Sequence, residues 1–417
     1  MSRIRGERAK LQRPAFILNT RAIGIGASRS LAMKGVPVVA VDFRPEAAKL
    51  RSNSFTAYHQ IPDIEKSPDA AVESLIQAQE PYAEKGVIFP TSDAFVLFVS
   101  RHRKELGKHF EIALPSEEVL EGMINKKFQY DIAAQLGVTI PDTYFPSSME
   151  EISSLKNDIS YPALIKPYYS HLWQPIFDNK GFQVFTPEEL MAQFRKVLSA
   201  GVEAMVQSVI QGPNPNLISV RAYFDKNGVP HGVMEAQKVR QYPVDFGVGC
   251  LTQTVHCEEV RKMGLKFMQA LGYRGVGYVE FKKDDRDGEY KMIELNARVG
   301  KTIGLSTRAG INLPWMMYQD LSGGQIDEVH DYPDKVRWHD FVHDCRAYMT
   351  LRSRGDITFK EWMRTSLGSE CHCYFAWNDL KPVMVESKYG YSSVKELFYV
   401  ALYSVGKSFK GSRSNQN

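Results

Sequence analysis

The residues with the clearest capacity for chemistry lie between Tyr278 and Arg298. Side chains alternate between the two faces of a β-strand, so Glu294 and Asn296 should point to one face, while Ile293 and Leu295 point to the other. One face of this segment is therefore apolar. The other carries oxygen ligands beside an arginine.

The run from Val276 to Lys283 has the same character, and Asp284 to Gly288 supplies turn-forming residues between the two strands. Pairing centred on that turn places Glu280 opposite Glu294. Like charges in this position destabilise a sheet unless solvent or a cation separates them. Two carboxylates and an amide are too few for calcium but suit magnesium, which takes further ligands from water and phosphates. The pattern predicts a magnesium and phosphate site that Arg298 also faces. The alternative is a solvent-facing hairpin.

Length and composition limit the class of protein. A chain of 417 residues is expected to form two or three domains. Its 43% hydrophobic and 24% charged residues are ordinary for a soluble globular protein. The net charge of +4 is small and dispersed, so a nucleic-acid partner is not expected. No apolar run approaches the roughly 18 residues of a membrane span, and no signal peptide is apparent, which predicts a cytoplasmic protein.

The five cysteines are odd in number and lack the paired spacing of a disulfide framework, so we expect them to be reduced. Cys371-His372-Cys373 resembles part of a metal site. It lies in a strand-like run from Cys371 to Trp377 and has no second ligand pair at a suitable spacing. We do not expect a metal there.

The N-terminal region has a βαβ pattern. Strands are predicted at Ala15 to Leu18 and Val36 to Val41, with a turn at Gly24 to Gly26 and a helix over Arg29 to Lys34. The glycine turn could bind an anion at the helix N-terminus. Asp42 follows too soon to be the usual ribose-binding acid, so NAD binding is not expected.

Further predicted strands and helices follow this βαβ pattern. Val87 to Phe89 is a strand that ends in Pro90 to Asp93, and a helix continues to about Leu106. Polar loops at strand ends of such sheets form clefts. Glu117 to Leu136 is then predicted to be one helix, and Gly137 ends it.

Two lysines precede the acidic hairpin. Asn125-Lys126-Lys127 precedes the helix that ends at Gly137, and Tyr161 to Pro167 is a strand with Lys166 at its end. Glu203 to Ile210 is another strand, which runs into a glycine and a proline. The chain thus presents lysine, lysine, strand and acidic hairpin in that order.

This order resembles the ATP-grasp superfamily, and the resemblance covers roughly residues 114 to 324. It implies an α/β (α+β) ATP-grasp fold with an N-terminal βαβ (pre-ATP-grasp) domain. The expected divisions are 1–113 for that domain, 114–325 for the ATP-grasp domain with a small lid subdomain at about 140–210, and 326–417 for a C-terminal α/β extension.

The resemblance also assigns roles. In the family, one lysine near the first helix and one at the strand end contact ATP phosphates, which implies Lys126 and Lys166, with Lys127 as a rival to the first. A hinge strand binds adenine through its backbone. The resemblance therefore implies ATP and Mg²⁺, with Mn²⁺ as an alternative ion. The remaining implied residues are Gln207, Ser208, Val209 and Ile210 at the base, Glu280, Glu294 and Asn296 at the metal, and Arg298 as the catalytic arginine.

Two features depart from the family pattern. Ser208 stands where a glutamate often contacts ribose, which leaves Asn214 or Asn216 for that contact. The phosphate lid expected between Lys166 and Phe185 has one glycine, so it should make contacts of its own. Its Trp173 either contributes to that lid or packs against the small domain.

The implied chemistry is amide formation. A substrate carboxylate attacks the terminal phosphate of ATP to give an acyl phosphate and ADP, and an amine then displaces phosphate. The expected partners are small-molecule carboxylates and amines, and the class is a carboxylate-amine ligase. The alternatives are an ATP-grasp phosphotransferase and a non-catalytic nucleotide-binding regulator.

Substrate residues are expected in a basic loop after the hinge. The stretch from Lys238 to Pro243 is similar to that of ATP-grasp enzymes of the D-aspartate ligase type. Arg240 could clamp a carboxylate in bidentate fashion and Lys238 could reach phosphate, while Arg221 and Lys301 are further candidates. The alternative is a solvated basic surface.

The C-terminal extension, Asp327 to Asn417, has predicted strands and helices. A helix over Ser392 to Val405 should pack against the body or a twin subunit, which would give a homodimer; contact with a membrane surface is the other use. The residues from Gly406 onward are expected to be disordered.

Overall fold

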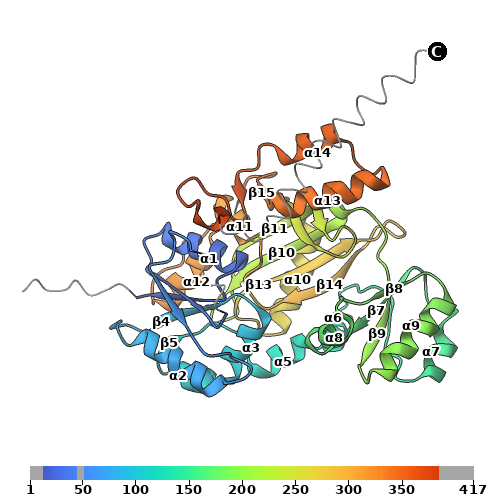
Figure 1. Ribbon diagram of the computed structural model, residues 1–417, viewed down its shortest axis with the longest axis horizontal. Helices are drawn as coiled ribbons and strands as arrows, with labels where there is room; N and C mark the ends of the chain where they lie inside the picture. Colours follow the sequence, from blue (N-terminus) through green and yellow to red (C-terminus); the bar gives the residue numbers. More distant parts are fainter. Residues whose placement is uncertain (1–12, 45–50, 330, 385–417) are drawn as a thin grey trace, which may run out of the picture.

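The computed structural model describes residues 13–44, 51–329 and 331–384. The strands of these residues form three sheets. The N-terminal sheet and the small green sheet lie at opposite ends of the view, and the largest sheet lies between them (Figure 1). Each sheet positions a different part of the predicted site.

The N-terminal sheet has five parallel strands in the order β3-β2-β1-β4-β5. β1, β2 and β4 are buried along their whole length, as expected of parallel strands that are covered on both faces. The predicted βαβ opening is confirmed. The elements are β1 Ala15–Leu18, α1 Ala22–Ala32, β2 Val38–Asp42, β3 Ala57–Gln60, α2 Pro68–Gln79, β4 Gly86–Pro90, α3 Asp93–Arg101, α4 Arg103–Leu106 and β5 Phe110–Glu111.

The glycines of this region lie inside helix α1, so the predicted turn at Gly24 to Gly26 was wrong. A Cβ on Gly24 would lie 2.1 Å from the carbonyl oxygen of Asn19, and one on Gly26 would lie 2.8 Å from a methyl group of Ile303. The two glycines therefore allow α1 to pack closely against the preceding loop and against a helix of the central region.

The predicted helix from Glu117 to Leu136 consists of two helices, α5 Glu117–Ile124 and α6 Lys126–Gln135. Asn125 separates them in an extended conformation, and its side chain accepts a hydrogen bond of 2.9 Å from the Lys127 amide. Asparagine is among the best N-terminal caps, which explains the break. Lys126 is therefore the first residue of α6.

The small antiparallel sheet has the order β6-β9-β7-β8 and its own hydrophobic core. The segment between Lys166 and Phe185 contains helix α8 and strand β8. Trp173 of α8 is fully buried against Phe177 and Phe182, so the packing alternative is confirmed for this residue. The elements are β6 Thr143–Tyr144, α7 Met149–Leu155, β7 Ala163–Pro167, α8 Ser170–Phe177, β8 Phe182–Val184, α9 Pro187–Ser199 and β9 Ala204–Ser208.

The central sheet has seven strands in the order β14-β13-β10-β11-β12-β15-β16. Helix α10 covers one face, where Val260 and Phe267 join a core with Val220 and Phe281 of the sheet. The opposite face carries the acidic hairpin. The elements are η2 Asn214–Asn216, β10 Leu217–Phe224, β11 Pro230–Tyr242, β12 Val248–Thr254, α10 Glu258–Ala270, β13 Gly275–Lys283, β14 Tyr290–Asn296, α11 Ile303–Arg308, α12 Leu313–Leu321, β15 Arg337–His339, α13 Phe341–Arg354, α14 Phe359–Ser366 and β16 Cys371–His372.

The predicted basic loop that begins at Lys238 is a strand, because Lys238 and Arg240 both lie in β11 and pair with β12. This strand has 13 residues, from Pro230 to Tyr242, and is separated from the acidic hairpin by β10. The interpretation as a loop was therefore wrong. The chain leaves the sheet only after Tyr242.

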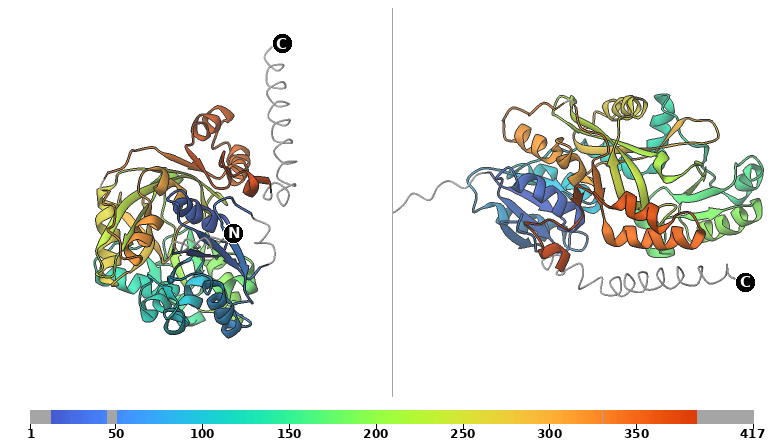
Figure 2. Two further views of the ribbon diagram at one scale, coloured as in Figure 1. Left: turned by 90° about the vertical axis from the view of Figure 1, so that its left-hand side faces the viewer. Right: turned by 90° about the horizontal axis from the view of Figure 1, so that it is seen from above.

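The C-terminal extension completes the central sheet instead of forming a sheet of its own. β15 pairs with β12, and β16 pairs with β15. The orange helix α13 of this segment lies against the strands β11 and β12 of the central sheet (Figure 2). The predicted strand from Cys371 to Trp377 is limited to Cys371–His372. The predicted helix over Ser392 to Val405 and the tail from Gly406 lie outside the described residues. The domain boundaries remain predictions.

Among the described residues, no helix has both the length and the apolar character needed to cross a bilayer.

Candidate active site

The acidic hairpin has the expected register at its acids. Glu280 of β13 lies opposite Glu294 of β14, and Asn296 lies opposite Tyr278. The Asn296 amide donates to Glu294 Oε1 at 3.1 Å. The register shifts by one between Glu280 and Phe281, so the bulge lies directly beside the acids. The hairpin thus brings two carboxylates and an amide to one face.

Each acid has a lysine beside it. The Lys126 ammonium is 3.7 Å from a Glu294 oxygen, and the Lys238 ammonium is 2.8 Å from a Glu280 oxygen. Lys127 instead pairs with Asp131 at 2.6 Å and so turns away from the hairpin. This geometry supports Lys126 as the site lysine.

Burial and the neighbouring charges shift the pKa of Glu294 in opposite directions. Burial disfavours its charged form, but Lys126 and the other nearby donors outweigh that cost and lower the pKa of the carboxyl to about 2. Glu294 is therefore ionised at neutral pH. An ionised carboxylate is the form that a divalent cation requires.

Lys166 projects from the end of β7 toward the same region. Its ammonium donates to Gln207 Oε1 at 2.7 Å, and the Gln207 amide donates to Thr143 at 2.9 Å. Burial, together with the positive charge of Lys126, lowers the pKa of Lys166 to about 8. The side chain of Gln207 thus holds Lys166, which leaves only the backbone of Gln207 for the predicted base contact.

The backbone of the predicted hinge is partly engaged. The amides of Ser208 and Val209 donate to the carbonyls of Asp142 and Pro162, each at 2.9 Å. Within the described part of the chain, the Ile210 amide donates to no backbone oxygen, so it is the amide that remains open to a ligand. The Ile210 carbonyl accepts a hydrogen bond from Lys282 at 2.8 Å.

Arg298 follows the hairpin and contacts the N-terminal domain. Its Nε–H donates to the Asp93 carboxylate at 2.6 Å. Asp93 is the first residue of α3, which follows the predicted polar strand end. Burial lowers the pKa of Arg298, but Tyr278 and Asp93 more than reverse this effect, so the guanidinium stays charged. Arg298 therefore links the acidic hairpin of the central sheet to helix α3 beside the N-terminal sheet.

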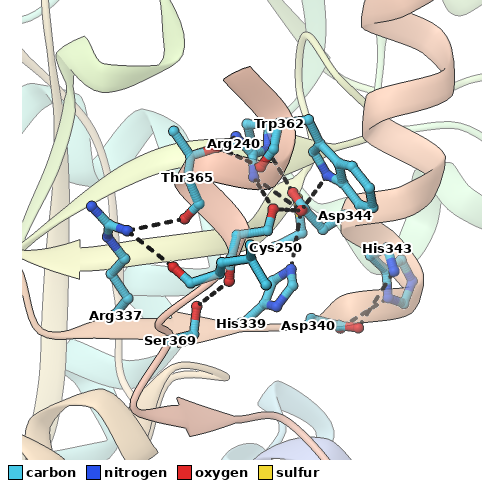
Figure 3. Close-up of polar contacts among 12 residues, drawn as sticks. Arg240, Cys250, Arg337, His339, Asp340, His343, Asp344, Trp362, Thr365 and Ser369 are labelled. Atoms are coloured by element: carbon cyan, nitrogen blue, oxygen red, sulfur yellow. Dashed lines mark hydrogen bonds and ion pairs between the residues drawn. The ribbon is translucent and has the colours of Figure 1, made fainter. Parts of the chain in front are cut away.

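Arg240 does not reach toward the hairpin. Its guanidinium forms a bidentate ion pair with the fully buried Asp344 of α13, at 2.6 and 3.0 Å, and also donates to Thr365 and Ser366 (Figure 3). His339 and Trp362 contact the same carboxylate (Figure 3). All the guanidinium nitrogens are occupied, so this arrangement favours a structural role over the predicted substrate clamp.

The two further candidates for substrate binding, Lys301 and Arg221, also contact residues of the chain. Lys301 binds Asp340 at 2.5 Å, and its ammonium lies over the Trp338 ring. Arg221 is buried and donates to Thr302 Oγ1 at 2.8 Å and Ser219 Oγ at 2.9 Å. Arg221 lies on the strand beside β13, close to the acids, while Lys301 lies farther along the same face.

Fit to a magnesium ion rests on the donor set. Among the described residues, no group of three or more His, Cys, Asp or Glu side chains could hold a metal, Cys371 to Cys373 included. Glu280, Glu294 and the Asn296 oxygen supply only part of a coordination shell, which suits an ion that takes its other ligands from phosphates and water. The residues therefore fit a nucleotide-bound magnesium.

Sequence reasoning missed Lys282 and the partner of Lys238. Lys282 lies two residues after Glu280, so strand alternation already placed both on one face. The Lys238–Glu280 pair joins residues 42 positions apart across an intervening strand, and no local pattern indicates it. Asp93 was noted as a polar strand end, yet its contact with Arg298 joins separate domains.

Comparisons with known proteins agree with this geometry. A family model for ATP-grasp in the biosynthetic pathway with Ter operon matches residues 244–341. D-aspartate ligase of Enterococcus faecium (strain Aus0004) is 24% identical over 288 residues, which are 66% of this chain and 68% of that protein. The large chain of carbamoyl phosphate synthase from Hyperthermus butylicus is 23% identical, and this chain spans only 32% of its length.

Two solved structures share the fold. The biotin carboxylase domain of 2-oxoglutarate carboxylase from Hydrogenobacter thermophilus, in complex with MgADP and bicarbonate, has a TM-score of 0.59, 17% identity and coverage of 78% of this chain and 73% of that one. L-amino acid ligase from Bacillus licheniformis has a TM-score of 0.56, 17% identity and coverage of 77% and 76%.

The fold is the ATP-grasp fold, and in sequence the chain is similar to members of the ATP-grasp superfamily. The α/β architecture predicted from the sequence is confirmed. Among these proteins, D-aspartate ligase is similar to this chain over about two thirds of both sequences.

Proposed function

We propose that the protein is an ATP- and magnesium-dependent carboxylate-amine ligase that forms an amide through an acyl phosphate and releases ADP and phosphate. The observation that carries this proposal is the facing pair Glu280 and Glu294, with Lys126 and Lys238 on its two sides. The similarity to D-aspartate ligase and to L-amino acid ligase supports the amide-forming class.

The roles follow from charge and position. Lys126 and Lys166 neutralise the ATP phosphates, and the backbone from Gln207 to Ile210 binds the base. Glu280, Glu294 and Asn296 would hold Mg²⁺, or Mn²⁺ in its place. When bound, the ion screens the phosphates so that an anionic nucleophile can approach. The MgADP complex of the Hydrogenobacter neighbour supports this assignment.

The reaction balances in two steps. A carboxylate oxygen of the acid attacks the terminal phosphorus, and the bond to the bridging oxygen breaks to release ADP. The amine nitrogen then attacks the acyl carbon and loses a proton, while the acyl–oxygen bond breaks and phosphate leaves. Arg298 stabilises the charge on the transferred group and on the tetrahedral oxyanion, and Asp93 orients Arg298.

The test is incubation of the full chain with ATP, Mg²⁺ and mixtures of amino acids. D-aspartate is the first acid to include, because the E. faecium relative is named for it. The proposal expects ADP and phosphate in equal amounts, together with an amide product. Release of AMP and pyrophosphate would contradict it, and ADP without free phosphate would point to a phosphotransferase. Tight ATP binding without turnover across the panel would favour a regulator.

A further inference from the structure

Arg221 is a buried cation that forms no ion pair with any residue the structure describes, although the Glu280 carboxylate acts on it electrostatically. Its side chain on β10 is only 7% exposed and donates to Thr302 and to the hydroxyl of Ser219. Among the described residues, its Nε–H meets no acceptor, and no carboxylate forms an ion pair with it. Arginine stays charged in proteins, and a buried charge is normally paired. A guanidinium in this state is expected to receive its counter-ion from a ligand.

A second unpartnered group lies on the same face of the sheet. Thr252 of β12 is 2% exposed, and its hydroxyl has no hydrogen-bond partner among the described residues. Thr252 lies opposite Lys238 on one side and opposite Trp338 on the other. Directly paired residues point to the same face, so Thr252 shares the face of Lys238.

The register connects these groups to the metal acids. Ser219 lies opposite Glu280, and Arg221 follows Ser219 by two residues, so Arg221 is on the acid face as well. Across the sheet, β14 and β13 carry the acids, β10 carries Arg221, and β11 and β12 follow. Lys126 contacts Glu294 on the outer strand β14. Arg221 is therefore on the opposite side of the acids from Lys126.

Two further cations border this area. Lys238 binds Glu280 at 2.8 Å, and Lys301 lies next to Thr302, the residue that Arg221 contacts. The Lys301 ammonium lies 5.9 Å from the centre of the Trp338 ring, which is opposite Thr252. Basic and hydroxyl side chains therefore border one patch of the sheet.

We infer that this patch is an anion subsite, in which Arg221 and Thr252 bind a second anionic group on the acid substrate. The subsite would select acids that carry a carboxylate or a phosphate in addition to the carboxylate that is activated. Lys238 and Lys301, which pair with Glu280 and Asp340, would lie at its edge. The inference deepens the proposed ligase function and rests on it.

The position explains why the ligand is the acid and not the nucleotide. The carboxylate that attacks the terminal phosphate must lie beside Glu280 and Arg298, between the phosphates and Arg221. A substrate of a few carbons then extends its other end away from Lys126 and toward Arg221. A guanidinium can hold such a group through two parallel hydrogen bonds, and Thr252 can donate a third.

The test compares acids matched in length with and without the second anionic group. Phosphate release is measured with ATP, Mg²⁺ and an amine mixture for succinate against butyrate, aspartate against 2-aminobutyrate, and 3-phosphoglycerate against glycerate. The wild-type chain should favour the doubly anionic acid by about 30-fold or more in kcat/KM. The phosphoglycerate pair separates a phosphate subsite from a carboxylate subsite.

Variants of Arg221 and Thr252 test whether these residues cause the preference for the doubly anionic acid. Arg221→Met should reduce the preference to within about threefold, Thr252→Val should reduce it in part, and the KM for ATP should stay unchanged in both. Arg221→Lys should keep part of the preference because the charge remains. Arg101→Lys is the matched control, since Arg101 is an exposed surface arginine that pairs with Glu121, far along the chain from the sheet.

A binding measurement tests the subsite in variants whose turnover is too slow to measure. Succinate or aspartate, added with Mg²⁺ and a non-hydrolysable ATP analogue, should raise the Tm of the wild-type chain and not of Arg221→Met, while butyrate should raise neither. An equal preference in folded wild type and Arg221→Met would overturn the inference. Amide formation from singly charged acids alone would leave the ligase proposal standing without the subsite. Arg221-dependent anion binding without turnover would leave the subsite standing without the ligase.

Discussion

Arg298 Nε donates to the Asp93 carboxylate at 2.6 Å, so the residue that follows the acidic hairpin is tied to the first turn of α3 in the N-terminal domain. The pair joins residues 205 positions apart. A substrate bound at the hairpin would therefore contact a group whose orientation depends on the packing of two domains.

Asp93→Asn should weaken this orientation while leaving the Arg298 charge in place. We expect kcat to fall roughly 10- to 100-fold, with little change in the KM for ATP, because a misplaced catalytic group affects the chemical step more than nucleotide binding. Asp69→Asn is the matched control, since Asp69 lies in the first turn of α2 in the same domain. Equal kcat values for the two variants would remove Asp93 from the mechanism.

Glu294→Gln should remove a metal ligand without removing bulk. Turnover should fall roughly 10²- to 10³-fold, and the Mg²⁺ concentration for half-maximal activity should rise, because one charged ligand is lost from the ion. Glu289→Gln, at an exposed position just before the same strand, should behave as wild type. A magnesium titration with both variants gives the comparison, and normal magnesium dependence in Glu294→Gln would contradict the metal assignment.

ATP binding should weaken above pH 8. Burial and Lys126 lower the pKa of Lys166 to about 8, so the free protein loses this positive charge as the pH rises through that value. The dissociation constant for ATP should then increase, approaching tenfold per pH unit. Lys166→Arg should flatten the profile, because arginine stays charged. Lys127→Arg, next to the site lysine but turned away from it, should keep the wild-type slope, and calorimetric titration at pH 7 to 9.5 measures all three.

The same pKa has a consequence for folding. Between about pH 8 and the ordinary lysine pKa of 10.5, the unfolded chain holds a proton on Lys166 that the native protein lacks. Stability rises with pH wherever the unfolded state binds more protons, so this lysine makes the native state more favourable as the pH increases through that window.

Arg240→Met should destabilise the protein by about 3–5 kcal/mol, because it leaves the buried Asp344 carboxylate without its guanidinium partner. Replacing both partners, as Arg240→Met with Asp344→Leu, should cost less than the sum of the single changes. Urea unfolding measures these free energies. If Arg240 bound substrate instead, the single variant would keep its stability and lose affinity for the acid.

The features that the sequence predicted best are those determined by residues close together in the chain. Alternation and the turn residues placed Glu280 opposite Glu294, and the structure has that register. The choice of Lys126 over Lys127 has a local cause too, since the Asn125 cap sets which lysine begins α6. Both features depend on contacts only a few residues apart.

Contacts between segments that are far apart in the chain could not be predicted from the sequence. Arg240 meets a carboxylate 104 positions later, in a helix of the C-terminal extension, and no spacing in the sequence indicates that pairing. Strand β11 continues through the supposed loop because β12 pairs with it, which is a tertiary effect on a polar segment.

The lysines beside the two acids set an order of events. Lys126 and Lys238 already neutralise Glu294 and Glu280, so a bare magnesium ion would have to displace an ammonium group from each carboxylate and gain only carboxylate contacts in return. A nucleotide that arrives with its metal offers the displaced ammonium groups new phosphate partners. We therefore expect the magnesium ion to bind together with ATP. Without nucleotide, the protein should not bind free magnesium at cellular concentrations.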